Sequence, residues 1–215
     1  MSLLKNLFKH IDRSVALRSV AAALVLVLTI SICGFDARCD EIRENVLRLH
    51  VLANSDTEED QALKLKVRDA LLAESEKVFK NCATEQEAVT AAQHHLKEFE
   101  QTAEKIIKNN GYNYSVRVEV AETWFETRDY EKFTLPAGTY EALRVIIGEG
   151  EGKNWWCVMF PSICLPAATP QNQGFKGVLE DDTAQLVEQP KRYKARFKVV
   201  EIFEKARKRI ADIFE

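Results

Sequence analysis

The sequence predicts an α+β fold, in which a strand is followed by two antiparallel helices packed on a largely antiparallel sheet, with an amphipathic helix at the C-terminal end. Residues 46–53 alternate in polarity, as a strand does, and residues 55–109 repeat apolar side chains at helical spacing. Residues 114–160 alternate again, which indicates several further strands. Strands and helices in separate runs are typical of an α+β domain.

The first strand and first helix are joined within residues 46–72. Arg48 and His50 are expected on one strand face, and the apolar residues Leu47, Leu49, Val51 and Ala53 on the other. Ser55 or Asp56 is expected to cap the helix, because Glu58 and Glu59 stand three residues after them as capping-box partners. The predicted apolar stripe of this helix is Leu63, Val67, Ala70, Leu71 and Val78.

A second helix is predicted over residues 84–109, opened by Thr84 with Glu87 and closed by Gly111. The short link between the helices favours antiparallel packing. His94 and His95 are adjacent and point apart on a helix, so we expect no metal site there.

The sheet is predicted to continue with strands at residues 114–120, 124–134, 139–147 and 155–160. The 139–147 segment is apolar on both faces from Ala142 onward, as a central strand would be. The GEGEG run at 148–152 is expected to be a flexible hairpin turn. A phosphate-binding loop is disfavoured, because Glu149 and Glu151 would repel the ligand.

The N-terminal segment is typical of an export signal or a membrane anchor. Four basic residues precede the apolar run Val20 to Cys33, which is short for a spanning helix. Cleavage and retention both remain open, because no clean small-x-small triplet follows the run. Ile32 disfavours a lipoprotein signal at Cys33. The basic flank is expected to stay in the cytoplasm and the rest of the chain to lie outside.

Composition indicates a globular chain, with 46% hydrophobic and 29% charged residues. Residues 1–39 hold five of the 30 basic residues and two of the 33 acidic ones, so residues 40–215 carry a balance of −6. A domain with this charge is not expected to bind nucleic acid.

Residues 165–190 contain several prolines and glycines and are predicted to be a loop or linker. Residues 191–215 are predicted to form a basic amphipathic helix, with the apolar stripe Val199, Phe203, Ala206, Ile210 and Ile213. Three roles stay open for it: packing on its own domain, contact with an anionic membrane surface, or docking in a partner's groove.

Two segments resemble one family. They are LRLHVLANSDTEEDQALKLKVRDALL, within residues 46–72, and KNWWCVMFPSIC, at 153–164. Their residues and their order along the chain are similar to the signature of the stage II sporulation protein R family of endospore-forming bacteria. The resemblance covers roughly residues 45–165. It implies a secreted sporulation signalling protein, made in the forespore and exported to the space between forespore and mother cell.

The resemblance also implies a partner. In that family the protein is needed for a membrane-embedded aspartic protease of the mother cell to cut the sigma-E precursor. No cofactor is expected. The candidate binding residues, which lie in the two signature segments, are His50, Asn54, Asp56, Asp60, Lys64, Arg68, Trp155 and Trp156.

The two tryptophans should point to opposite faces of their strand, one or both of them into the core. Cys157 and Cys164 flank Pro161, and outside the cytoplasm they can form a disulfide or stay as two buried thiols.

Two other functions compete with signalling. His50 with Asp56 or Asp60 would serve an extracytoplasmic enzyme. We favour helix capping and dipole complementarity for the acids and therefore predict no catalysis. The other competitor is a membrane-anchored structural envelope protein. The expected domains are 1–39 (export signal or anchor), 40–164 (α+β signalling domain), 165–190 (linker) and 191–215 (C-terminal helix).

Overall fold

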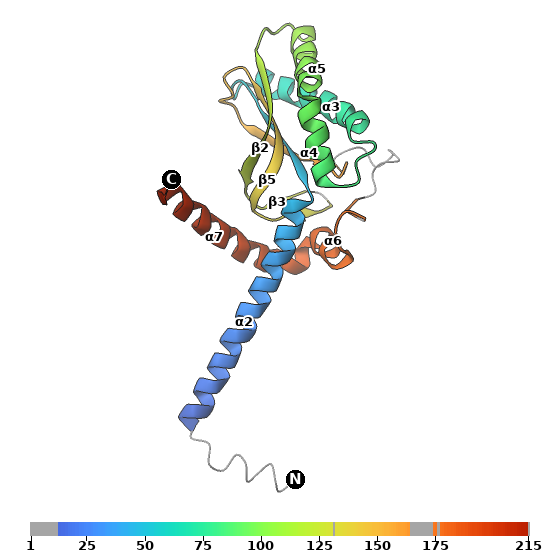
Figure 1. Ribbon diagram of the computed structural model, residues 1–215. Coiled ribbons are helices and arrows are strands. Elements are labelled where there is room, and N and C mark those ends of the chain that lie inside the picture. Colours follow the sequence, from blue (N-terminus) through green and yellow to red (C-terminus); the bar gives the residue numbers. More distant parts are fainter. Residues whose placement is uncertain (1–12, 131, 164–173, 176, 215) are drawn as a thin grey trace. The chain divides into compact units, whose positions relative to one another are not determined.

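The computed structural model describes residues 13–130, 132–163, 174–175 and 177–214 (Figure 1). The chain divides into two compact units, residues 1–38 and 39–215. The helix α2 (Arg13–Glu44) begins in the first unit and ends in the second.

In the first unit, many apolar side chains of α2 are exposed, including Val20, Leu24 and Leu28. The helix is long and apolar enough to cross a membrane, a test that an N-terminal signal sequence also passes. An exported or anchored N-terminus is therefore compatible with the structure.

The second unit is built on a four-stranded sheet in the order β2-β5-β1-β6. Its strands are β1 (Leu47–Leu52), β2 (Val116–Phe125), β5 (Gly138–Ile147) and β6 (Asn154–Phe160). β1 runs parallel to β5, while the β1–β6 and β2–β5 pairs are antiparallel. The mixed but largely antiparallel sheet confirms the α+β class.

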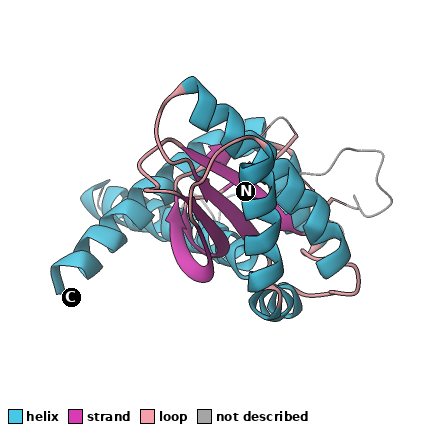
Figure 2. Cartoon of the chain, turned by 90° about the horizontal axis from the view of Figure 1, so that it is seen from above, coloured by secondary structure: helices cyan, strands magenta, loops and turns pink. Residues whose placement is uncertain are grey.

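Three helices pack on one face of this sheet: α3 (Glu58–Val78), α4 (Glu85–His94) and α5 (Leu96–Asn109) (Figures 1 and 2). The single helix predicted over residues 84–109 is wrong, because His95 separates α4 from α5. His95 has φ −108° and ψ 15°, and its backbone N–H and ring Nδ1 both lie in hydrogen-bond range of the Ala91 carbonyl. These bonds satisfy a carbonyl left open at the end of α4.

The core lies between the helices and the sheet. Leu47, Leu49 and Val51 enter it from β1, as their alternation predicts, and all three are fully buried. They meet apolar residues of the helices, including Leu63, Val67, Leu71, Val89, Phe99 and Ile107. β1 and β5 are the two central strands, since each has a strand on both sides and apolar residues in the core under the helices.

The cap of α3 differs from the prediction. Thr57 is the N-cap residue, and its Oγ1 accepts a hydrogen bond of 3.3 Å from the Asp60 N–H. Ser55 and Asp56 stand before the cap and make other contacts, described below. Three acidic residues do lie in the first turn, where the helix dipole favours them: Glu58, Glu59 and Asp60.

The strand predicted at residues 124–134 is also wrong. Trp124 belongs to β2, which pairs with β5 from Val116 opposite Ile147 to Phe125 opposite Gly138. β5 is ten residues long and so offers a partner to every residue of β2. The remainder forms a separate two-stranded ladder of β3 (Arg128–Asp129) and β4 (Thr134–Leu135).

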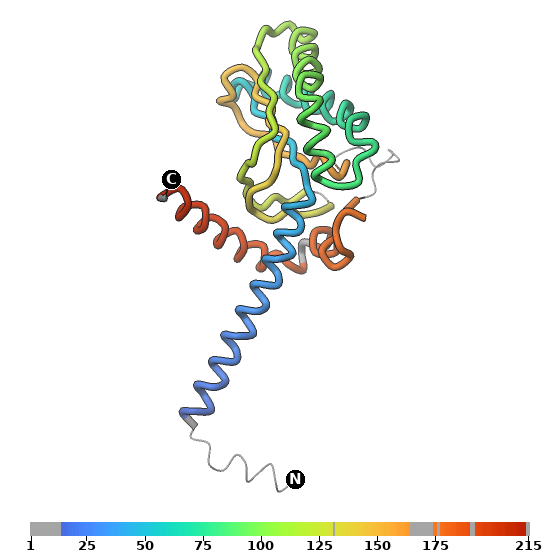
Figure 3. Tube along the Cα trace, viewed as in Figure 1, coloured from blue at the N-terminus to red at the C-terminus, as the bar shows by residue number. Residues whose placement is uncertain are grey.

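The glycine-rich loop at 148–152 is not a hairpin, because β1 lies between β5 and β6. The loop crosses the end of β1, and Figure 3 follows this connection along the chain. Glu151 N donates to the Asn54 carbonyl at 3.2 Å, and Gly152 N donates to the Ala53 carbonyl at 2.9 Å. Backbone contacts with the β1–α3 turn therefore replace the ladder of a hairpin.

Two helices end the chain, α6 (Asp181–Glu188) and α7 (Pro190–Phe214). α6 lies inside the predicted 165–190 linker, which was therefore wrong for these residues. The carboxylate of Glu41 accepts hydrogen bonds from the Glu180 N–H at 2.8 Å and the Thr183 hydroxyl at 2.5 Å. Burial of Leu186 and Val187 adds to this attachment. The rest of the predicted linker lies mostly outside the described residues.

A buried carboxyl at the start of α4 should make stability depend on pH. Burial, and then the nearby carboxylate of Glu141, raises the pKa of Glu85 from its ordinary value near 4.5 to about 7. A carboxyl group whose pKa is higher in the folded state than in the unfolded state stabilises the fold while it is protonated. This contribution is complete below the pKa of the unfolded state and is lost as pH rises from about 4.5 to about 7.

We therefore expect Glu85→Gln to raise the free energy of unfolding by about 2 kcal/mol at pH 8 and by little at pH 5. Urea unfolding at both pH values measures this. Glu98→Gln, at an exposed position of α5, is the control and should change stability by less than about 0.5 kcal/mol at either pH. Equal effects of Glu85→Gln at both pH values would contradict the prediction.

Candidate binding site beside strand β6

The turn from β1 to α3 is held by a buried carboxylate. Asp60 Oδ2 accepts hydrogen bonds from Asn54 Nδ2 at 2.9 Å and Ser55 Oγ at 2.6 Å. Burial alone would raise the pKa of Asp60, but hydrogen bonds from Ser55, Asn54 and Tyr114 outweigh it and lower that pKa below its usual value. Asp60 is therefore ionised in the folded protein and organises the turn.

The same turn holds the glycine-rich loop. Asn54 Oδ1 accepts from Glu149 N at 3.1 Å, and Asp56 Oδ1 accepts from Lys153 N at 2.7 Å. Lys64, which is buried, donates from Nζ to the Lys153 carbonyl at 2.8 Å. Four of the predicted binding residues, Asn54, Asp56, Asp60 and Lys64, thus make contacts inside the chain that fix where β6 begins.

Close packing between loop and turn should make Gly152 irreplaceable. A Cβ at Gly152 would lie 2.2 Å from the Ser55 carbonyl oxygen, which is backbone and cannot move away cheaply. We expect Gly152→Ala to lower the free energy of unfolding by about 2–3 kcal/mol in urea unfolding. Gly111→Ala, where φ is +83° and no atom lies within 4 Å, isolates the cost of conformation and should lose only about 1 kcal/mol. A smaller loss at Gly152 than at Gly111 would contradict this packing.

His50 lies on the other face of β1. Its Nε2 is 2.8 Å from Asn154 Oδ1, and its ring packs near Phe125 and Trp156. Burial, with smaller contributions from the charges of Arg144 and Arg48, lowers the pKa of His50 despite the hydrogen bond to Asn154. The imidazole is therefore neutral at pH 7.

The three residues considered for catalysis have separate partners. His50 contacts Asn154, Asp56 accepts from the backbone of Lys153, and Asp60 accepts from Asn54 and Ser55. Among the described residues, no hydrogen bond or ion pair joins any two of the three. Among all the residues that the structure describes, no three His, Cys, Asp or Glu side chains cluster so that they could hold a metal ion.

Sequence reasoning missed the environment of Arg48, expected simply on the strand face opposite the core. Arg48 is fully buried, with its guanidinium 3.9 Å from the centroid of the Phe125 ring and 5.0 Å from that of Tyr140. It donates to the Tyr130 hydroxyl at 2.8 Å. A second layer of aromatic side chains therefore covers the β1 face that the alternation alone would leave wet.

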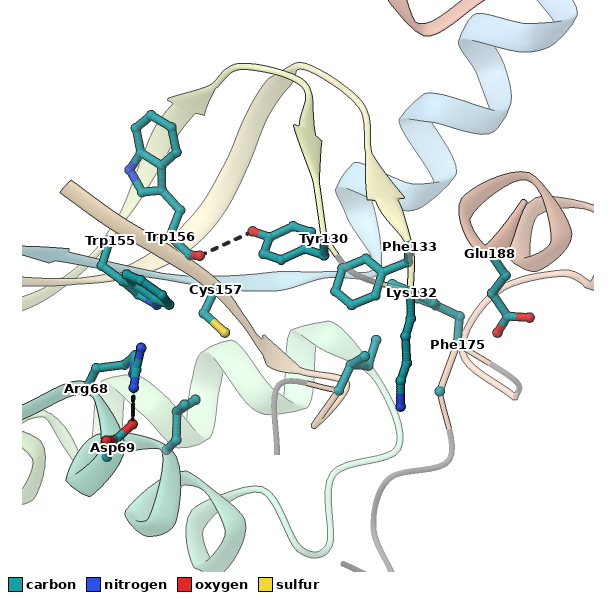
Figure 4. Close-up of a pocket in the computed structure, with 13 residues that line it drawn as sticks. Arg68, Asp69, Tyr130, Lys132, Phe133, Trp155, Trp156, Cys157, Phe175 and Glu188 are labelled. Atoms are coloured by element: carbon teal, nitrogen blue, oxygen red, sulfur yellow. Dashed lines mark hydrogen bonds and ion pairs between the residues drawn. The ribbon is translucent and has the colours of Figure 1, made fainter. Parts of the chain in front are cut away.

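Arg68 and Trp155 form one wall of a pocket beside β6. The guanidinium of Arg68 lies 4.4 Å from the Trp155 ring centroid and is paired with Asp69 at 2.6 Å. The pocket has a volume of about 670 Å³ (Figure 4). Its lining is Arg68, Asp69, Leu72, Tyr130, Lys132, Phe133, Trp155, Trp156, Cys157, Ile163, Gly174, Phe175 and Glu188.

The two tryptophans lie on opposite sides of β6, as predicted. Figure 4 shows Trp155 facing Arg68 and Trp156 directed the other way. The Trp156 carbonyl accepts a hydrogen bond from the Tyr130 hydroxyl at 3.4 Å. Both indoles are half-buried, so each has a packed side and an open side.

Sequence reasoning did not find the rest of the aromatic wall. Tyr130 stacks on Phe133 with ring centroids 4.5 Å apart, and Phe133 meets Phe175 edge-on at 5.3 Å. These residues come from the β3–β4 region and from a segment far along the chain, so they share no periodic pattern. Only their aromatic character was available as a signal. The pocket therefore has aromatic walls, with charged residues of both signs among its lining, namely Arg68, Lys132, Asp69 and Glu188.

Cys157, which also lines the pocket, is disulfide-bonded. Its predicted partner Cys164 lies outside the described residues, so the pairing of these two stays a prediction. Cys33 and Cys82 are free thiols.

Comparison with known proteins places this architecture in a family. The family model for stage II sporulation protein R matches residues 43–170, which run from the end of α2 past β6. The stage II sporulation protein R of Bacillus subtilis (strain 168) is 37% identical over 124 residues, covering 58% of this chain and 55% of that protein. The chain thus spans about half the length of the curated relative that it matches. No solved structure matches the chain. Since the family model covers more than half of the chain and both signature segments, the chain belongs to the stage II sporulation protein R family.

Proposed function

We propose that this protein is an exported sporulation signal that activates a membrane-embedded aspartic protease, so that the sigma-E precursor is processed in the mother cell. Membership of the family supports a role in sporulation. The protease partner is the one that the family resemblance implies. The protein acts in this proposal by binding, without catalysis of its own.

The observation that carries a binding role is the pocket beside β6. Tryptophan, tyrosine and arginine are the residues most enriched where binding energy concentrates in protein interfaces. Here Trp155, Tyr130 and Arg68 line one hollow of about 670 Å³, with lysine and acidic side chains in its lining. Trp156 also lines it, but its indole is directed away from Arg68 (Figure 4). The pocket can receive an apolar side chain of a partner and surround it with polar contacts.

Activation by binding requires a difference in affinity. A ligand shifts the protease toward its active arrangement only if it binds that arrangement more tightly than the inactive one. A tenfold preference corresponds to about 1.4 kcal/mol, less than one buried tryptophan typically contributes to an interface.

Export across a membrane is supported by the apolar part of α2. The space between forespore and mother cell is the destination that the family resemblance implies. A signal peptide and a single-pass anchor are both compatible with that helix. The disulfide at Cys157 also suits an oxidising compartment outside the cytoplasm.

The two competing functions receive less support. An enzyme using His50 with Asp56 or Asp60 would need these side chains to converge, and each has a different partner. A structural envelope protein would depend on anchorage by Val20 to Cys33. A chain freed from the membrane and supplied outside should still signal under our proposal, and should fail if the protein is structural.

Co-expression outside sporulation tests the proposal. The protease and the sigma-E precursor are produced together in vegetative cells, with or without the exported full chain. We expect precursor cleavage only when the chain is present. A chain without residues 1–33 stays in the cytoplasm and is the control for export. Cleavage that is independent of the chain, or that proceeds with the cytoplasmic form, contradicts the proposal.

A further inference from the structure

The C-terminal helix α7 carries an apolar stripe that the domain does not use. Its packing side is made by Phe197, Val200, Glu201 and Glu204, all buried. The stripe consists of Val199, Ile202, Phe203, Ala206, Ile210 and Ile213. Its large members are between 46% and 76% exposed. At about 100° per residue the stripe covers an arc of roughly 100°, centred about 160° away from the packing side.

The charged residues of α7 are also divided between its packing side and its exposed surface. The two acidic residues Glu201 and Glu204 lie on the packing side, where Glu201 pairs with Lys198 and Lys205 and Glu204 lies 3.8 Å from Arg43. On the exposed surface of α7, from Arg192 to Ile213, the charged residues are basic except for Asp212. Arg207 borders the stripe on one side and Arg209 on the other. Arg207 also lies 3.7 Å from Glu204, but its side chain remains 69% exposed.

We propose that α7 docks on an anionic membrane surface, with its apolar stripe in the headgroup–acyl boundary and the flanking arginines on lipid phosphates. An apolar stripe with basic residues along both borders is the pattern of an interfacial helix, because the long basic side chains reach up to the phosphates. Each basic residue near such a surface contributes affinity. Asp212 is the one acidic residue described on this outer surface, so repulsion from the lipid is small.

The apolar run that could insert in a membrane is also close in sequence to the second unit. Only residues 34–38 separate the apolar run that ends at Cys33 from the start of the second unit at Cys39. A retained anchor would therefore deliver this unit to a bilayer, and a cleaved leader would leave α7 as its means of staying there. α7 (Figure 1) lies outside residues 43–170, which match the family model, so the proposal does not rest on that match.

Amide hydrogen exchange of the full chain tests this docking. The chain is reconstituted in vesicles of phosphatidylcholine alone or with 30% phosphatidylglycerol, the same in both leaflets, and exchange is followed by mass spectrometry. We expect the amides of residues 199–213 to exchange at least fivefold more slowly in the anionic vesicles. Amides of β1 and β5 should be unchanged, because they report the fold.

Two variants and one control make the test specific. Phe203→Glu with Ile210→Glu places charge in the stripe and should abolish the slowing. Arg207→Gln with Arg209→Gln removes phosphate contacts and should reduce it by at least threefold. Gln86→Glu with Gln101→Glu adds the same two charges at exposed sites on α4 and α5 and should leave the slowing intact.

Three results would overturn the proposal. Equal exchange in the two kinds of vesicle would exclude recognition of anionic lipid. Slowing that persists in Phe203→Glu with Ile210→Glu would show that the stripe is not in contact. Slowing that grows with protein concentration at constant lipid would show that a second copy covers α7.

Discussion

Replacing Asp60 by alanine is expected to lower the free energy of unfolding by about 3 kcal/mol at pH 7. The carboxylate is buried and accepts from Asn54 and Ser55, and hydrogen bonds to a charged group are worth more than neutral ones. Its removal leaves the Asn54 amide and the Ser55 hydroxyl without their acceptor. Chemical denaturation monitored by circular dichroism measures the loss.

The pH dependence of the wild-type protein checks the same group. Because hydrogen bonds from Ser55, Asn54 and Tyr114 lower the pKa of Asp60 in the folded state against the effect of burial, its contribution is present above the unfolded pKa. It is lost as pH falls through the folded value. The stability difference between wild type and Asp60→Ala should therefore shrink in acid.

Glu59→Ala is the matched control, since Glu59 is an exposed acid in the same helical turn. It should cost no more than about 0.5 kcal/mol, the usual size of an exposed dipole contribution. If Asp60→Ala costs no more than Glu59→Ala, Asp60 does not hold the turn together.

Trp155→Ala is expected to reduce precursor cleavage in the co-expression assay at least tenfold. Trp155 stacks on Arg68 and lines the pocket with its exposed side, and a tryptophan at the centre of an interface commonly contributes about 2 kcal/mol or more. A loss of about 2 kcal/mol corresponds to about thirtyfold in affinity. Quantitative immunoblots of precursor and product measure the effect.

Trp124→Ala controls for the loss of a half-buried indole. Trp124 lies on β2, is contacted by Lys208, and does not line the pocket beside β6. Urea unfolding of both variants separates instability from lost binding, and Trp155→Phe should restore most of the cleavage because it keeps an aromatic wall. Equal losses from Trp155→Ala and Trp124→Ala would argue against the pocket.

The first half of the fold was predictable because its pattern is local. The alternation of Leu47, Arg48, Leu49 and His50 is enough to assign β1 and its faces, and the stripe of Leu63, Val67 and Leu71 is enough to assign α3. The break at His95 was not predictable, because both halves continue the helical pattern and a side-chain hydrogen bond decides it.

The order of the strands in the sheet could not be predicted from the sequence, for a physical reason. The glycine-rich loop at Gly148–Gly152 is flexible enough to form either a tight hairpin or a crossover over another strand. Its sequence alone does not favour one of these connections over the other. The choice follows from Asn54 and Asp56, which bond the loop over the end of β1. These are long-range contacts that no local period encodes.

The candidate site was predicted in part. Arg68 and Trp155 do meet at one pocket, and Trp156 lines it with its indole directed away, whereas Asn54, Asp56, Asp60 and Lys64 build the turn that supports it. Tyr130, Phe133 and Phe175 come from short or irregular segments and were not found. For α7, the helical spacing of apolar residues predicts the stripe but not whether the stripe faces the domain or the solvent. Phe197 and Val200, on another side of the helix, make the packing contacts.

A photo-crosslinking amino acid in place of Lys132 tests most directly whether the pocket meets the protease. Lys132 is exposed and lines the pocket, and the same probe at the exposed Lys97 on α5 is the control. In cells where the precursor is being cleaved, we predict a crosslink to the protease from position 132 and none from position 97. Active cleavage without a crosslink from position 132, or with equal crosslinks from both, would contradict docking through this pocket.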